Sequence, residues 1–272
     1  SADTSSIYTT DVSGTDDTAS GNSAYGYQAL DAITTGDNNV AIGLSALGAN
    51  TTGANNVAVG SIAFDANTTG GQNVAIGYTA MGAQTTASNN VAVGNQALQT
   101  NQTGTELVAV GHEALKANLG DACVAVGFQA LLANTTGASN IAIGSTALAA
   151  NTTGSRNIGI GSNANDSSDT ENDNIAIGYN AMTTDSAGGL QNLAIGNYAL
   201  QALTSGDGNM ALGHNAGYTV TTGSRNVGLG LSSLETNNAD DNTAVGYNAM
   251  NATTTGADNV AIGRDALVAN TT

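Results

Sequence analysis

The sequence has no proline, no tryptophan and a single cysteine, Cys123. One cysteine cannot build an internal disulfide framework. The absence of proline suits a structure in which every interior backbone N–H donates to a neighbouring strand. Aromatic residues make up only 4% and charged residues 9% of the 272 residues. Such a restricted composition indicates an internal repeat rather than an ordinary globular domain.

Positive charge is also scarce, with 4 Lys and Arg against 21 Asp and Glu and a formal net charge of −17. A surface of this sign repels phosphate, so we expect no nucleic-acid partner. Anionic membrane surfaces are disfavoured for the same reason. No apolar run is long enough to cross a bilayer, so we expect no membrane insertion. The acidic surface serves solubility.

A repeat that reads N-V-A-I-G-x-x-A-L-x-A-N-T-T-G-x-N runs through the chain. The glycine that closes its V-A-I-G part recurs every 17 residues, except for two steps of 16 and one of 18, at positions 26, 43, 60, 77, 94, 111, 127, 144, 161, 178, 196, 213, 230, 246 and 263. This spacing predicts about fifteen coils in a single repeat domain, residues 22–272, after an irregular lead-in, residues 1–21.

The V-A-I part has the period-2 pattern of a β-strand. We expect its Val and Ile to face the core, and the Leu of a second short segment to complete that core. All three changes in repeat length fall between this Leu and the next Asn-Val, and insertions collect in turns. The pattern predicts an all-β fold, a parallel β-solenoid (β-roll), with a core that includes Val57, Val59, Leu98, Val108 and Leu115.

The residue before the Leu is Ala in nearly every coil. On a strand its side chain would point away from the Leu and out of the core. A free surface position would vary, so the restriction to Ala predicts close packing by another backbone. Either a second copy of the chain or another part of the same chain would lie there, or the local conformation would admit only small side chains. The residues that would pack in such an association are Ala46, Ala63, Ala80, Ala97 and Ala114.

The N-x-V-A-I-G element, with its Ala and Gly-rich turns, resembles the head repeats of trimeric autotransporter adhesins. The Tyr-x-Ala-Leu variant at 27–30, with Asn-Thr-Thr-Gly turns, is similar to repeats of phage tail fibres. The resemblance covers nearly everything from Asn22 onward, although this unit is longer than the usual adhesin-head repeat. It implies a left-handed β-roll, three chains packed side by side as a homotrimer, and an extracellular, cell-surface or virion location.

Histidine and cysteine give no catalytic pattern. His112 and His214 occupy a variable column after the glycine and lie six coils apart, so they cannot share a site within one chain. Cys123 replaces the Asn that precedes Val, and we interpret it as a tolerated small residue. P-loop, dinucleotide-binding and zinc motifs are absent. We therefore expect no enzyme activity and no cofactor.

An acidic turn at 165–174 replaces the usual Asn-Thr-Thr-Gly. The candidate Ca²⁺ ligands are its four carboxylates, Asp166, Asp169, Glu171 and Asp173. Four acidic residues in a solvated turn, however, need no metal. In the same coil Asn165 stands where Leu is expected, which predicts the least well packed coil and a candidate hinge.

Aromatic residues share the column after the glycine, four of them at every third coil. These residues are Tyr27, Tyr78, Phe128, Tyr179 and Tyr247. They either stack on sugar rings of a receptor glycan or cover strand edges.

These features predict a structural or adhesive fibre segment, a surface adhesin or tail-fibre shaft, with a host or cell-surface receptor as its partner. The alternative is a monomeric solenoid that binds ice or another crystal surface through Thr columns. The adjacent Thr51 and Thr52 should point in different directions, which weakens that alternative. A polysaccharide-cleaving β-helix would need long loops that these turns do not provide.

Overall fold

The computed structural model describes the backbone of residues 7–8 and residues 18–184, 189–252 and 254–269. The chain divides into two compact units, residues 1–136 and residues 137–272. In the described residues the regular structure consists of short strands joined by turns, and no helix there is long and apolar enough to cross a membrane. The prediction of a single domain over 22–272 stays a prediction.

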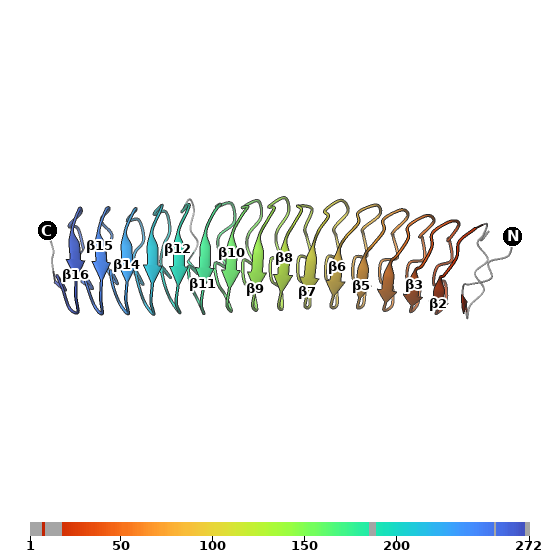
Figure 1. The fold of residues 1–272 in the computed structure, drawn as a ribbon, viewed down its shortest axis with the longest axis horizontal. Coiled ribbons are helices and arrows are strands. Elements are labelled where there is room, and N and C mark those ends of the chain that lie inside the picture. Colours follow the sequence, from red (N-terminus) through yellow and green to blue (C-terminus); the bar gives the residue numbers. More distant parts are fainter. Residues whose placement is uncertain (1–6, 9–17, 185–188, 253, 270–272) are drawn as a thin grey trace. The chain divides into compact units, whose positions relative to one another are not determined.

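The first unit is a parallel β-solenoid, with one short strand in each coil (Figure 1). Successive strands pair in parallel and in register, as Val57 does with Val74 and Val59 with Ile76. Pairing already begins at β1, within the expected lead-in. The strands are β1 (Ile7–Tyr8), β2 (Ser23–Tyr25), β3 (Val40–Ile42), β4 (Val57–Val59), β5 (Val74–Ile76), β6 (Val91–Val93), β7 (Val108–Val110) and β8 (Val124–Val126).

The second unit continues the same pattern. Its strands also pair in parallel with the repeat register, as Ile158 does with Ile175. They are β9 (Ile141–Ile143), β10 (Ile158–Ile160), β11 (Ile175–Ile177), β12 (Leu193–Ile195), β13 (Met210–Leu212), β14 (Val227–Leu229), β15 (Thr243–Val245) and β16 (Val260–Ile262). Both units therefore confirm the predicted β-solenoid and its spacing of about 17 residues.

The face of the strand that looks into the core is the opposite of the one predicted. In β4 the middle residue, Ala58, is fully buried, whereas Val57 and Val59 are half-buried on the outer face. Val108 of β7 is likewise half-buried. The prediction of these three valines as core residues is wrong, because a coil this narrow has room for only one small strand side chain beside its Leu.

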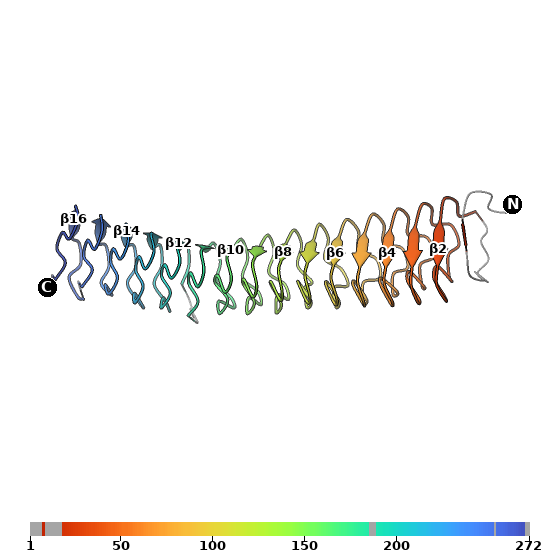
Figure 2. The same cartoon turned by 90° about the horizontal axis from the view of Figure 1, so that it is seen from below.

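The segment after the strand is a turn and not a second strand. Two of its residues have positive φ in every coil, as do Gln96 (φ 58°) and Leu98 (φ 51°). This left-handed geometry breaks the alternation of a strand, so that both Ala and Leu point inward. Leu98 and Leu115 are fully buried, as predicted. Within each unit, the strands lie along one side of the coils and the turns along the other (Figure 2).

The alanine column is therefore part of the core of this same chain. Ala46, Ala63, Ala80, Ala97 and Ala114 are all 0% exposed. They cannot be the contact surface of a second copy, and the prediction that they pack against a partner is wrong. The second explanation, that the chain itself covers this position, is the correct one.

A ladder of buried asparagines holds the coils in register. The backbone N–H of Asn56 donates to Asn39 Oδ1 (3.0 Å), and that of Asn73 donates to Asn56 Oδ1 (3.0 Å). The side-chain amide of Asn56 donates in turn to the Gly70 carbonyl (2.8 Å). Each of these amides satisfies buried backbone groups of two coils. Leu107 and Cys123 replace the ladder residue in two consecutive coils.

Candidate functional site

The outer face of the sheet carries two continuous apolar columns in each unit, which we call the valine face. In the first unit the columns are Val40, Val57, Val74, Val91, Val108 and Val124, and Ile42, Val59, Ile76, Val93, Val110 and Val126. Ile42 and Ile76 are exposed and the valines are half-buried. No charged residue occupies either column from β3 to β8. This face is a candidate interaction surface.

The second unit presents the equivalent face on β9–β16. Its columns hold Ile, Leu, Met and Val, interrupted only by Thr243. Ile143, Met210 and Leu229 are about two-fifths exposed, at 40%, 44% and 42%. The chain carries a net charge of −17, so the uncharged columns on both units differ in charge from the rest of its surface.

All four cationic side chains of the protein are held by carboxylates. Lys116 Nζ contacts Glu113, and Arg156 and Arg225 pair with Asp173 and Asp241 at 2.6 Å each. Arg264 contacts Asp265 at 3.1 Å. The hydrogen bond from Arg156 holds the pKa of Asp173 below its usual value. The positive charges are thus already neutralised, which disfavours an anionic ligand.

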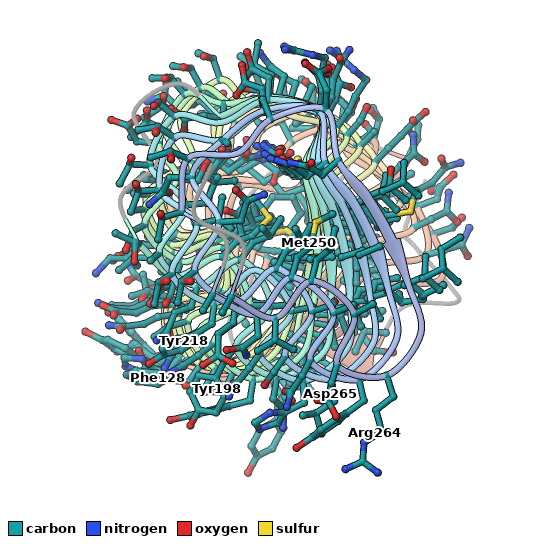
Figure 3. All side chains as sticks on the ribbon, turned by 90° about the vertical axis from the view of Figure 1, so that its left-hand side faces the viewer. Phe128, Tyr198, Tyr218, Met250, Arg264 and Asp265 are labelled. Carbon is teal, nitrogen blue, oxygen red and sulfur yellow. The ribbon has the colours of Figure 1, made fainter. Side chains whose placement is uncertain are left out.

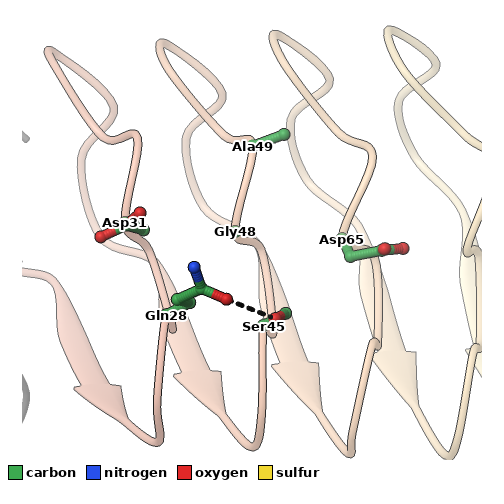
Figure 4. Close-up of a pocket in the computed structure, with 6 residues that line it drawn as sticks. All are labelled: Gln28, Asp31, Ser45, Gly48, Ala49 and Asp65. Carbon is green, nitrogen blue, oxygen red and sulfur yellow. Dashed lines mark hydrogen bonds between the residues drawn. The ribbon is translucent and has the colours of Figure 1, made fainter.

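Two pockets lie on the turn side of the first unit, in the column of residues that follows the Leu. We call them the notched groove, which contains Asp31, Gly48, Asp65, Gly82 and Gln99. The first notch, of about 230 Å³, lies over Gly48 between Asp31 and Asp65, with Gln28, Ser45 and Ala49 as its other lining residues (Figure 4). Ser45 Oγ donates to Gln28 Oε1 across it at 3.5 Å.

The second notch, of about 360 Å³, repeats the first after 34 residues. It lies over Gly82, which is equivalent to Gly48. Its other lining residues are Ile62, Asp65, Thr79, Ala83, Gln99 and Thr100. Asp65 is shared by both notches. Burial raises the pKa of Asp65, and among the described residues its Oδ1 has no hydrogen-bond partner.

The five aromatic residues singled out in the column after the glycine are all exposed, with Tyr27 at 70% and Tyr78 at 51%. Phe128 stacks on His112, with ring centroids 5.6 Å apart. Tyr247 lies under the Arg264 guanidinium. Their role in glycan contact stays a prediction.

A cluster of aromatic rings in the second unit was not expected from the sequence. Tyr198 makes edge-to-face contacts with Tyr179, His214 and Tyr218, at centroid distances of 5.4, 5.8 and 6.2 Å. Tyr198 and Tyr218 project outward, whereas Met250 of the same unit lies inside the coil (Figure 3). These aromatic residues occupy three different columns, so a search along one column misses them. The cluster could have been found by comparing the aromatic residues of adjacent coils across all columns.

The histidines and the cysteine lie in different surroundings. His112 is exposed and lies 3.7 Å from Glu113, and His214 belongs to the tyrosine cluster. The Cys123 thiol is fully buried and donates to the Asp121 carbonyl at 3.5 Å. A buried thiol of this kind is a packing residue.

The acidic turn does not bring its four carboxylates together. Glu171 is 2% exposed and accepts hydrogen bonds from Ser168 Oγ (2.7 Å) and Asp169 N (3.0 Å), so it closes its own turn. Asp173 pairs with Arg156. Asp166 is half-buried, and burial raises its pKa. Within the described residues no group of three or more His, Cys, Asp or Glu is placed to hold a metal ion.

Replacement of Asn165, in the coil that contains this turn, by Leu should stabilise the protein. Its side chain is fully buried in the Leu column, and neither side-chain polar atom has a partner among the described residues. Asn165→Leu should raise the free energy of unfolding by about 2 kcal/mol, because it removes an unsatisfied buried amide and adds apolar burial. Thermal unfolding followed by circular dichroism measures this. Asn163→Leu, in a half-exposed position of the same coil, is the control, and an equal gain there would contradict the explanation.

Comparisons with protein-family models, with curated proteins and with solved structures find no match to this chain.

Proposed function

We propose that this chain is a non-enzymatic structural and adhesive segment of a surface or virion fibre, and that copies of it assemble through the valine face. The observation that carries the proposal is the pair of uncharged apolar columns on the outer face of the strands in each unit. Apolar surface of this extent favours burial by about 25 cal/mol per Å² removed from water.

A second copy of the same chain is the partner that fits this face best. The partner must be apolar, uncharged and matched to the strand spacing of about 4.8 Å over several coils. The valine face of another copy meets all three requirements. Its lack of charge also allows two chains of net charge −17 to approach where like charges do not oppose each other. The resemblance of the repeat to trimeric adhesin heads implies three copies.

A lysine placed on the valine face tests this contact. Val93 lies in the middle of the columns, and Asn95, two residues later, is exposed beyond the end of β6. Val93→Lys should abolish association at micromolar concentration, because burying an unpaired charge costs several kcal/mol, whereas Asn95→Lys should leave association intact. Light scattering on a size-exclusion column reads out the mass. Equal masses for the two variants would contradict the proposed interface.

Two other functions receive less support. Surface recognition of ice would use free Thr hydroxyls, but Thr51 Oγ1 donates to the Thr68 carbonyl (3.0 Å) and Thr68 Oγ1 to the Thr85 carbonyl (3.1 Å). The second Thr of these turns, such as Thr52, is exposed, and so is Thr85. Catalysis through the cysteine or the histidines finds no support in the described residues, since the Cys123 thiol is buried and both histidines lie on the surface.

A further inference from the structure

We propose that the notched groove of the first unit binds an uncharged, linear, β-1,4-linked polysaccharide laid across its coils. The proposal names a ligand for the adhesive part of the function given above, and it does not depend on association through the valine face.

The spacing of the notches is the first argument. Gly48 and Gly82 lack side chains, and each leaves a hollow between longer side chains of the coils on either side. The coils are hydrogen-bonded at this column: Ala49 N donates to the Asp65 carbonyl (3.0 Å) and Ala83 N to the Gln99 carbonyl (2.9 Å). Two coils therefore separate the notches by roughly 10 Å. An extended β-1,4-linked chain turns each sugar over relative to the last, so it presents the same face once per disaccharide, a repeat close to two coils.

The lining of the notches is the second argument. Asp31, Asp65 and Gln28 offer acceptors for sugar hydroxyls, Ser45 and Thr79 offer hydroxyls, and no Lys or Arg lines either notch. The methyl groups of Ala49 and Ala83 suit the C–H faces of a sugar ring. A binding site with a few polar groups around small apolar ones is typical of a specific small-molecule site. The carboxylates disfavour acidic sugars.

An exposed aromatic residue directly precedes one lining residue of each notch in the sequence, although the two tyrosines lie three coils apart and the two notches two coils apart. Tyr27 directly precedes Gln28 of the first notch, and Tyr78 directly precedes Thr79 of the second. Both rings are more than half exposed, at 70% and 51%. An exposed Tyr has an apolar face and a polar tip, which suits it to stack against a sugar ring.

A single metal ion does not explain this groove. Ca²⁺ needs several oxygen ligands, each at about 2.3–2.6 Å, whereas Asp31 and Asp65 belong to coils two steps apart, roughly 10 Å. The two carboxylates therefore cannot bind one ion together, and an extended ligand is required to contact both.

The test uses cellohexaose and chitohexaose as probes, with maltohexaose and an oligogalacturonate of the same length as comparison ligands, in titration calorimetry of the whole chain. We expect one of the first two to bind, and the double variant Gly48→Ala/Gly82→Ala to bind it about tenfold more weakly or less, because each added methyl group occupies the floor of a notch and hinders close approach of the sugar. Ala149 stands at the equivalent position of another coil, so the repeat accepts this substitution. Unchanged thermal unfolding confirms that the variant folds.

Two tyrosine variants provide the matched control. Tyr78→Ser should weaken binding, and Tyr247→Ser, in the second unit, should not. The proposal is overturned if neither neutral probe binds, if the double variant binds as tightly as the native chain, or if maltohexaose or oligogalacturonate binds better. Self-association is measured separately by mass. A chain that binds sugar as a monomer would therefore refute only the assembly, and an assembled chain that binds none would refute only the groove.

Discussion

Gly77→Ala should destabilise the protein by more than about 4 kcal/mol, a size seen only when substitution breaks a specific structural requirement. Gly77 has φ +136°, a conformation that residues with a side chain rarely adopt, and an added Cβ would lie 2.3 Å from the carbonyl oxygen of Gly94. The clash is with the backbone of the next coil, so no rotation of a side chain relieves it. Loss of the thermal transition or of soluble protein reads out the effect.

Gly82→Ala, five residues later in the same coil, is the control for this prediction. Gly82 has an ordinary φ, and its added Cβ would come no closer than 3.3 Å to the nearest atom, the Thr79 carbonyl oxygen. The free energy of unfolding should change by less than about 1 kcal/mol, since the loss of chain freedom in the unfolded state offsets a small local crowding. Similar losses of stability at the two glycines would contradict the close approach of Gly77 to the backbone of the next coil.

Leu98→Ala should lower the free energy of unfolding by about 3–5 kcal/mol. Leu98 is fully buried and is the largest core side chain of its coil, and its N–H donates to the Ala114 carbonyl (3.1 Å). Truncation leaves a cavity that neighbouring coils cannot fill, because their register is fixed by the ladder hydrogen bonds. Chemical unfolding followed by circular dichroism measures the loss.

The neighbouring Gln99→Ala isolates the role of burial. Gln99 is half-exposed, so its truncation should change stability by about 0.5 kcal/mol or less. If Leu98→Ala cost no more than Gln99→Ala, the turn residue would not be a core residue, and the description of the coil interior would be wrong.

The repeat, the strands and their parallel register could all be predicted from the sequence, because the period of the glycines locates each V-A-I and the length changes locate the turns. The side of the strand that faces inward could not. A strand of three residues, such as Val57–Val59, contains one alternation, and either phase is consistent with period 2. The outcome is decided by the following turn, where positive φ at Gln96 and Leu98 directs Ala97 and Leu98 inward together.

The candidate surfaces were predicted only in part, for the same reason. Exposure of Tyr27 and Tyr78 followed from their variable column, but the alanine column was assigned to a partner because the strand pattern was extended into a turn. Once Ala46 and its equivalents are in the core, the outward surface is the valine face. The notches over Gly48 and Gly82 depend on which side chains in the next coils are long, and this becomes apparent only when the coils are stacked.

The solution mass of the native chain, measured by light scattering over a series of dilutions, tests the central claim most directly. The account predicts a particle of about three times the chain mass of 26.6 kDa that dissociates only on strong dilution, because the valine face is buried between copies. A particle of 26.6 kDa at every concentration would show that this face stays open to water, and it would contradict assembly through it.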